Sequence, residues 1–312
     1  MKTVFSYKDK LPRQYVDFLI DLIPKSFTVE RLPFSAPDSQ FERALKETDI
    51  AIFTPSGKYL PEHLYGNRLK LIQLLSSGYD KFNVEGATKK GIPVANNGGA
   101  NAIAVAEYTI LLILAVLRGL PGNLERGRQG KGMDQDYGMN LNTLHGKTVG
   151  IIGYGNIGSK VSERLQSFGA KILINDIKPV PNSSPLNELI ENSDIITLHL
   201  RNNPQTAGII GKKEFGLMKK GVILINTARP ELIDDQALYA ALKEDKLGGL
   251  GLDVVTDKKK IDARLLSLKN VIITPHVAGA AKETYEAAMM FAVKNFEHIA
   301  RGEKPESVIN SL

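Results

Sequence analysis

The chain of 312 residues contains no cysteine, which excludes disulfides and thiolate metal sites and suits a reducing cytoplasm. The lysines behind its formal charge of +6 are scattered and form no basic stripe with aromatic residues, so the charge suits anionic substrates better than nucleic acid. Its one long apolar stretch, residues 102–117, carries Glu107 and is too short to span a membrane, and charged residues come too early for a signal peptide. We expect a cytoplasmic protein with no metal, membrane or nucleic-acid partner.

Short apolar runs typical of strands alternate with helical patterns along the whole chain. Such alternation predicts parallel sheets wound by helices, and the length suits two domains. The expected strands cover residues 3–6, 50–53, 71–75, 92–95, 149–152, 171–175, 195–198, 222–226, 250–254 and 271–274. We further expect helices at 102–118 and 283–300, and an irregular connection at 121–142, where periodicity is weak.

The most informative motif is a glycine-rich segment after the expected strand 149–152. Gly153, Gly155 and Gly158 would permit a tight turn, the approach of backbone to a pyrophosphate, and close packing of the next helix, whose N-terminus attracts phosphate. Asp176 then falls where a ribose 2′-hydroxyl binds. These features predict a Rossmann dinucleotide site. The alternative is a glycine-rich turn without a ligand.

Other short motifs follow one another in a specific order. They are Leu74-Leu-Ser-Ser-Gly-Tyr-Asp80, Gly91-Ile-Pro-Val-Ala-Asn96, Gly99-Ala-Asn-Ala with Val105-Ala-Glu107, Asn226-Thr-Ala-Arg229, Gly251-Leu-Asp253-Val and Thr274-Pro-His276-Val-Ala-Gly279. With them the chain resembles the D-isomer-specific 2-hydroxyacid dehydrogenase family over nearly its full length.

The resemblance implies an α/β protein of two doubly wound parallel-sheet domains with the active site in the cleft between them. Residues 98–282 would form the Rossmann NAD-binding domain, and residues 1–97 and 283–312 a flavodoxin-like substrate domain. The implied reaction is reversible hydride transfer between NAD(H) and C2 of a D-2-hydroxy acid or 2-oxo acid. The family also implies a homodimer.

The resemblance assigns catalytic roles to two residues at expected strand ends. Arg229 would hold the substrate carboxylate and polarise its carbonyl, since a guanidinium is a permanently charged fork of donors. The family has glycine after this arginine, whereas Pro230 follows here, which holds Arg229 in an extended conformation and suits a helix start. His276 would be the acid in reduction and the base in oxidation.

The third catalytic residue of the family, a glutamate that bonds the histidine, is missing. Its position holds Lys258, and no glutamate occurs between Leu247 and Asn270. A neighbouring carboxylate raises the pKa of an imidazole, whereas an ammonium lowers it. Asp257 is the candidate replacement.

The resemblance also implies binding residues. For substrate these are Ser77, Gly78 and Asn101, although the Ser-Ser-Gly segment could be an ordinary turn and Asn101 a helix N-cap. For the cofactor they are the three glycines, Asn156, Ile157, Asp176, His199, Thr206, Thr227, Ala228, Asp253 and Gly279, although Asp253 could instead be a structural residue at a strand end. Asp176 favours NAD over NADP, whose 2′-phosphate it would repel.

Two other functions stay open. The missing glutamate suits a catalytically weak NAD(H)-sensing interaction protein of the same fold. An oxidoreductase of this fold that acts on a substrate such as formate or phosphite is a further alternative. The motifs do not specify the side chain of the substrate.

Overall fold

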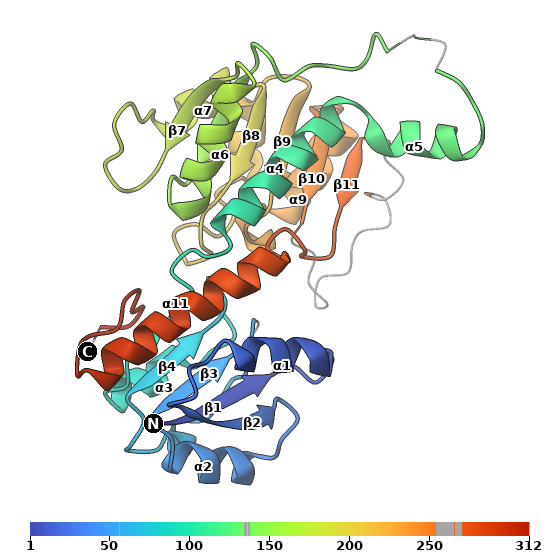
Figure 1. Cartoon of the computed structure of the whole chain (residues 1–312). Helices are drawn as coiled ribbons and strands as arrows, with labels where there is room; N and C mark the ends of the chain where they lie inside the picture. Colours follow the sequence, from blue (N-terminus) through green and yellow to red (C-terminus); the bar gives the residue numbers. More distant parts are fainter. Residues whose placement is uncertain (56, 134–135, 137, 254–264, 266–269, 312) are drawn as a thin grey trace. The chain divides into compact units, whose positions relative to one another are not determined.

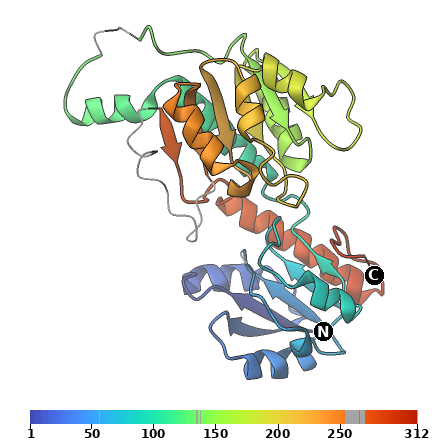
Figure 2. The same cartoon turned by 180° about the vertical axis from the view of Figure 1, so that it is seen from behind.

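The computed structural model describes residues 1–312 apart from 56, 134–135, 137, 254–264, 266–269 and 312 (Figure 1). The chain forms two compact units: unit 1 is Met1–Asn101 with Ala280–Leu312, and unit 2 is Ala102–Gly279. The sequence-based boundaries lay between residues 97 and 98 and between 282 and 283. Each unit is a parallel sheet with helices on both faces, which Figures 1 and 2 show from opposite sides.

Unit 1 contains a five-stranded parallel sheet in the order β2-β1-β3-β4-β5. Its elements are β1 (Lys2–Tyr7), α1 (Arg13–Asp21), β2 (Thr28–Pro33), α2 (Asp38–Lys46), β3 (Ile50–Phe53), η1 (Glu62–Leu64), β4 (Leu71–Leu74), α3 (Val84–Lys89), β5 (Val94–Ala95) and α11 (Lys282–Ala300). The sequence did not predict β2. Of its residues only Leu32 is fully buried, so this edge strand lacks the apolar run that marks the others.

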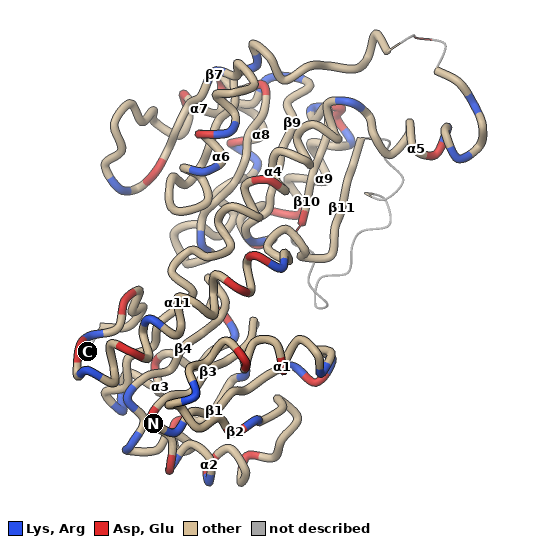
Figure 3. Tube along the Cα trace, in the orientation of Figure 1, with Lys and Arg blue, Asp and Glu red and all other residues tan. Residues whose placement is uncertain are grey.

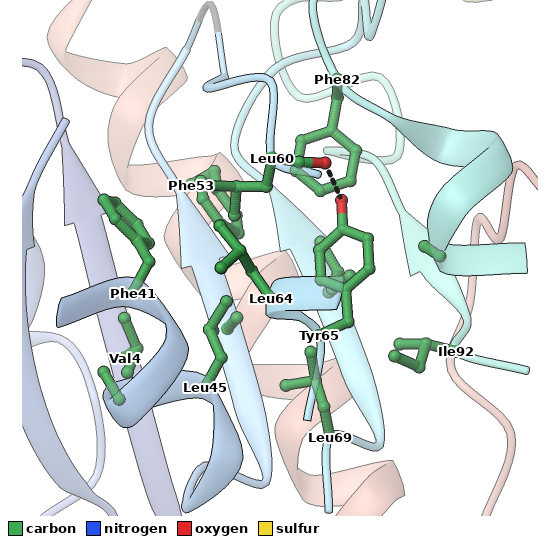
Figure 4. Packing of buried hydrophobic residues seen from close by; sticks show 14 of the residues in the cluster. Val4, Phe41, Leu45, Phe53, Leu60, Leu64, Tyr65, Leu69, Phe82 and Ile92 are labelled. Carbon is green, nitrogen blue, oxygen red and sulfur yellow. Dashed lines mark hydrogen bonds between the residues drawn. The ribbon is translucent and has the colours of Figure 1, made fainter. Parts of the chain in front are cut away.

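The strands of unit 1 bury alternate side chains on the two faces of the sheet, as pleating requires. In β1, Val4 packs in the cluster with Phe41 of α2, whereas Phe5 packs with α1 and α11 on the other face. Figure 4 shows the first cluster, where the Tyr65 hydroxyl donates to Leu60 O beside Phe82. Both faces of this sheet are therefore buried.

Unit 2 contains a six-stranded parallel sheet in the order β11-β10-β9-β8-β6-β7. Its elements are α4 (Ala102–Leu117), α5 (Leu120–Arg128), β6 (Thr148–Ile152), α6 (Asn156–Ser167), β7 (Lys171–Asn175), α7 (Leu186–Asn192), β8 (Ile195–Leu198), α8 (Lys212–Leu217), β9 (Val222–Asn226), η2 (Pro230–Leu232), α9 (Asp235–Lys243), β10 (Leu247–Leu252) and β11 (Val271–Ile273). Strand order reverses between β6 and β8, and ligands of doubly wound sheets bind at the carboxyl ends of strands beside such a point.

The helices of unit 2 cover both faces of its sheet. Helices α4 and α6 pack on one face, where Ile223 and Ile225 of β9 point, and α7, α8 and α9 cover the other face with Leu224. Helix α4 is mostly buried. Of the described helices, none is by itself long and apolar enough to cross a membrane, and only the bent pair of α4 and α5 meets that test by length and composition.

The expectation of an irregular connection at 121–142 is wrong at its start, because α5 occupies Leu120–Arg128. Gly119 in the left-handed region (φ 55°) precedes this helix, and Pro121 lies in its first turn, where its missing N–H costs nothing. None of its residues is buried. Because this helix buries no side chain, its sequence lacks the apolar periodicity by which an amphipathic helix is recognised. Charged residues of both signs are interspersed along the described chain (Figure 3).

Candidate active site

The glycine-rich loop after β6 has the geometry of a phosphate-binding turn. Gly153 has φ +95°, and a Cβ there would lie 2.7 Å from His199 O. A Cβ on Gly158 would lie 2.0 Å from Gly153 O, so α6 can start against the loop only with glycine there. A Cβ on Gly155, by contrast, would meet no atom within 4 Å. The two outer glycines are therefore required by packing, and the middle one borders open space.

Helix α6 begins beside that open space. Gly155 and Asn156 are exposed, Ile157 packs against the core, and no side chain in the described part of the chain caps the helix. The first N–H groups of a helix lack intrahelical partners and carry its positive dipole end. The loop therefore suits an anion such as a pyrophosphate.

The carboxylate of Asp176, at the end of β7, is fixed against this loop. Its Oδ2 accepts from Tyr154 N at 2.6 Å, and its Oδ1 accepts from Lys178 N at 2.8 Å. Two carboxylate oxygens offer about four acceptor sites, so two are left for a ligand. Asp176 is partly exposed, as an acceptor for a ribose hydroxyl must be.

The segment after β8 carries His199 and Thr206. His199 Nε2 lies 3.0 Å from Thr197 Oγ1, and its Nδ1 is buried with no hydrogen-bond partner among the described residues. Burial lowers the pKa of His199 to about 3, so the ring is neutral at neutral pH and unsuited to proton transfer there. The Thr206 hydroxyl donates to Arg201 O at 2.6 Å and accepts from Asn203 N at 2.9 Å, which orders the loop.

Arg229 lies just after β9, and the side chain of Asn226 fixes its backbone. Asn226 is fully buried; its Oδ1 accepts from Ala228 N at 2.9 Å, and its Nδ2 donates to Arg229 O at 2.8 Å. Arg229 has φ −144° and ψ 137°, the extended conformation that a following proline favours, and η2 starts at Pro230. The guanidinium Nη1 donates to Ala228 O at 2.7 Å. The hydroxyl of Thr227 lies 3.0 Å from that of Thr109 on α4.

His276 is exposed in the turn after β11, at the same carboxyl edge of the sheet. Asp253, which follows β10, holds this turn: its carboxylate accepts from Thr274 Oγ1 at 2.6 Å, Val277 N at 2.9 Å and Ala278 N at 2.7 Å. The backbone N–H of Asp253 donates to Asn226 O at 3.0 Å. A chain of hydrogen bonds through Asn226 and Asp253 thus connects the backbone at Arg229 with the turn of His276. Gly279 ends this turn and unit 2.

Sequence reasoning assigned no role to Asn226 or Thr274. Both residues lie at the end of an apolar strand, within a motif that contains a candidate catalytic residue. This position could have marked them as candidates. A polar side chain buried at such a place needs hydrogen-bond partners, and the chain nearby supplies them.

The candidate substrate residues Ser77, Gly78 and Asn101 belong to unit 1. Ser76 Oγ donates to Gly78 O at 2.7 Å, and Asn96 Nδ2 donates to Ser77 O at 3.2 Å, so the turn is held through its carbonyls. Within the described residues, no hydrogen bond engages the N–H of Ser77 or Gly78. Asn101 Oδ1 is buried without a partner there, so it does not cap α4, and the N-cap alternative is wrong. Asp257 and Lys258 lie outside the described residues.

Comparison with known proteins decides the family. The family model "D-isomer specific 2-hydroxyacid dehydrogenase, NAD binding domain" matches residues 110–278. The chain is 33% identical to a glyoxylate reductase of Thermococcus litoralis, with 96% of each protein covered. The chain belongs to the D-isomer-specific 2-hydroxyacid dehydrogenase family. It is an NAD-dependent dehydrogenase of that family with a Rossmann NAD-binding domain.

Two further comparisons cover different shares of the matched proteins. This dehydrogenase is 38% identical to a D-3-phosphoglycerate dehydrogenase of Methanocaldococcus jannaschii over 85% of its own chain, but it spans only 52% of that protein. The D-lactate dehydrogenase of Aquifex aeolicus, solved with NAD and lactic acid, superposes with a TM-score of 0.82 at 30% identity, with 96% of each chain covered. The described part of this chain contains no cluster of three or more His, Asp or Glu that could hold a metal ion.

Proposed function

We propose that the protein reduces a small 2-oxo acid to the D-2-hydroxy acid with NADH, reversibly. The main support for the proposal is the set of hydrogen bonds at the carboxyl edge of the sheet of unit 2. There Asn226 fixes the backbone of Arg229, and Asp253 fixes the turn of His276. A charged fork of donors and an imidazole at one sheet edge are the two groups that reduction of a 2-oxo acid needs from a protein.

Arg229 would bind the substrate and polarise it. A guanidinium bonds a carboxylate through two parallel N–H groups and keeps its charge at any pH of interest. Negative charge develops on the carbonyl oxygen as C2 is reduced, and a nearby cation stabilises that charge. The extended backbone at Arg229, held by Asn226 and Pro230, fixes where the side chain starts.

His276 would supply the proton. As C2 of the substrate gains a hydride, its carbonyl oxygen takes a proton from the imidazolium and becomes the hydroxyl, and oxidation reverses both transfers. His276 is exposed, unlike His199, whose lowered pKa removes it from this role. The substrate roles of Ser77, Gly78 and Asn101 stay predictions.

The residues around the glycine loop fit NAD. Gly155 and the start of α6 would hold the pyrophosphate, and Asp176 would accept from the adenosine ribose. When bound, the reduced nicotinamide supplies the hydride. The fit rests on the open space at Gly155 and on the acceptor sites that Asp176 keeps.

Small 2-oxo acids are the proposed substrate class, because the compared relatives are named for glyoxylate, lactate and 3-phosphoglycerate. The test is a screen of glyoxylate, hydroxypyruvate, pyruvate, phenylpyruvate and longer 2-oxo acids for oxidation of NADH. We expect at least one to be turned over. If none is, although NADH binds, the protein is the catalytically weak NAD(H)-sensing alternative, which the lysine at position 258 supports.

We also propose that the protein is a homodimer through α4, α5 and the segment that follows. Large apolar side chains are exposed along them: Ile103, Leu111, Leu124, Met133 and Met139. Short helices are stabilised mainly by packing, yet α5 buries no residue within its own chain. A second copy would cover this surface.

Size-exclusion chromatography with light scattering tests the dimer. The protein should elute as a dimer, Leu124→Glu should elute as a monomer, and Tyr59→Glu, at an exposed apolar residue of unit 1, should stay dimeric. A monomeric wild type, or a dimeric Leu124→Glu variant, would contradict this interface.

A further inference from the structure

The turn that carries His276 has an unusual backbone. His276 has φ 58°, in the left-handed region that residues with a Cβ rarely adopt. A side chain in such a conformation persists only where the surroundings fix it, and such residues cluster at functional sites. The bond from His276 N to Thr274 O at 3.0 Å closes the turn but does not anchor it to the sheet.

The Thr274 N–H donates to Leu252 O of β10 at 2.8 Å, and the side chain of Asp253 anchors the turn on both sides of His276. Asp253 is 1% exposed, and its carboxylate accepts from the residue two places before His276 and from the two residues after it. The donors at Thr274, Val277 and Ala278 therefore enclose His276 on both sides. The backbone of Asp253 is itself bonded to Asn226 at the end of β9.

We propose that Asp253 is a positioning residue of the reaction: it holds His276 in the left-handed turn from which the imidazole reaches the substrate. This inference rests on the proposed role of His276 as the acid and base. It goes beyond the sequence-based expectation that Asp253 contacts the cofactor: three of the roughly four acceptor sites of its carboxylate serve the turn, which leaves one for such a contact.

The chemistry of the contact requires a carboxylate. Two N–H groups and one hydroxyl converge on two oxygens, and an ionised carboxylate only accepts. In an Asp253→Asn variant, the amide NH2 would replace one oxygen and face at least one donor. That donor would be left buried and unsatisfied, so the turn should shift.

The first experiment compares Asp253→Asn with Asp194→Asn. Asp194, at the amino end of β8, likewise accepts from a backbone N–H (Thr148, 2.8 Å) and from a side chain (Lys219, 2.9 Å), but lies at the opposite edge of the sheet. With the 2-oxo acid that the wild type reduces best, Asp253→Asn should lower kcat about 100-fold, the scale expected for a misplaced catalytic group. Its Kd for NADH should stay within about threefold of wild type, and Asp194→Asn should keep its kcat.

Two results would overturn the inference. One is a loss of NADH affinity that matches the loss of kcat, which would make Asp253 a cofactor ligand. The other is a kcat for Asp253→Asn that equals that of Asp194→Asn. If Asp253→Asn does not fold, variants of Thr274 test the inference instead. Thr274→Val should lower kcat several-fold, and Thr274→Ser, which keeps the hydroxyl, should retain the wild-type kcat.

A double-mutant cycle separates this inference from the proposed function. His276→Gly removes the imidazole and suits the left-handed backbone. If Asp253 acts through His276, adding Asp253→Asn to His276→Gly should not lower the residual rate further. Losses that multiply would overturn the positioning role. If His276→Gly alone keeps full turnover, the proposed function fails, whatever Asp253 does.

Discussion

The backbone N–H of Tyr154 donates to Oδ2 of Asp176 at 2.6 Å, which fixes the carboxylate after β7 against the glycine loop after β6. Asp176, which would bind the ribose, is thus hydrogen-bonded to the loop that would hold the pyrophosphate. Under the proposed roles, cofactor choice and cofactor placement would both depend on this contact.

Asp176→Asn should weaken the preference for NADH over NADPH. Asn keeps an acceptor for Tyr154 N but loses the charge that repels a 2′-phosphate. We expect the ratio of kcat/KM for NADH to kcat/KM for NADPH to fall about tenfold, equivalent to 1.4 kcal/mol. Asp234→Asn, at a carboxylate that caps α9, is the control and should leave the ratio unchanged. A wild type that prefers NADPH would show that Asp176 has another role.

Arg229→Ala should lower kcat about 10² to 10³-fold, as expected for loss of a group that stabilises developing negative charge. Binding of NADH, measured by fluorescence titration, should change little, because Arg229 would contact substrate. Arg229→Lys should recover only part of the rate, since an ammonium lacks the bidentate fork. A parallel loss of NADH affinity would instead make Arg229 a cofactor or folding residue.

The pH profile tests which residue replaces the missing glutamate. If Lys258 occupies the carboxylate position, Lys258→Glu should raise the pKa of His276, so that the imidazolium needed for reduction persists to higher pH. The alkaline limb of kcat/KM should then move upward in pH. If Asp257 has taken the role, Asp257→Asn should lower the rate and Lys258→Glu should matter little. No shift in either variant would mean that neither residue tunes His276.

His199 should make stability depend on pH between 7 and 5. Its pKa is about 3 in the folded protein and near 6.5 when unfolded, so the unfolded state binds the proton first. Stability from the neutral ring is complete above pH 6.5 and falls as pH decreases, by up to about 2 kcal/mol at pH 5. Urea unfolding at both pH values should show a smaller loss for His199→Gln than for wild type. Equal losses would contradict the buried neutral ring; His63→Gln, at an exposed histidine, is the control.

Much of the fold could be predicted because its strands are continuous apolar runs. In β9, buried on both faces, residues 222–226 were expected as a strand and form one. The helix α5 and the edge strand β2 escaped prediction because neither buries an apolar stripe. Most elements could be recognised from the apolar residues with which helices pack against the sheet, rather than from local propensity.

The glycine loop could also be predicted, since the turn at Gly153 and the close packing at Gly158 are local requirements. The contacts of Asp253 could not. They join it to residues more than twenty positions away along the chain, through a register that only the assembled β10–β11 pair defines. A motif can indicate that such an aspartate is functionally important, but not which residues it hydrogen-bonds.

The most direct test of the proposed function is the product of the reaction. Purified protein is incubated with NADH and pyruvate, or with the most active 2-oxo acid of the screen that yields a chiral product, because glyoxylate would give achiral glycolate. The product is separated by chiral chromatography. We predict stoichiometric oxidation of NADH with formation of the D-2-hydroxy acid, and loss of both in His276→Ala. Formation of the L-isomer, or no oxidation of NADH with any 2-oxo acid, would contradict the proposed function.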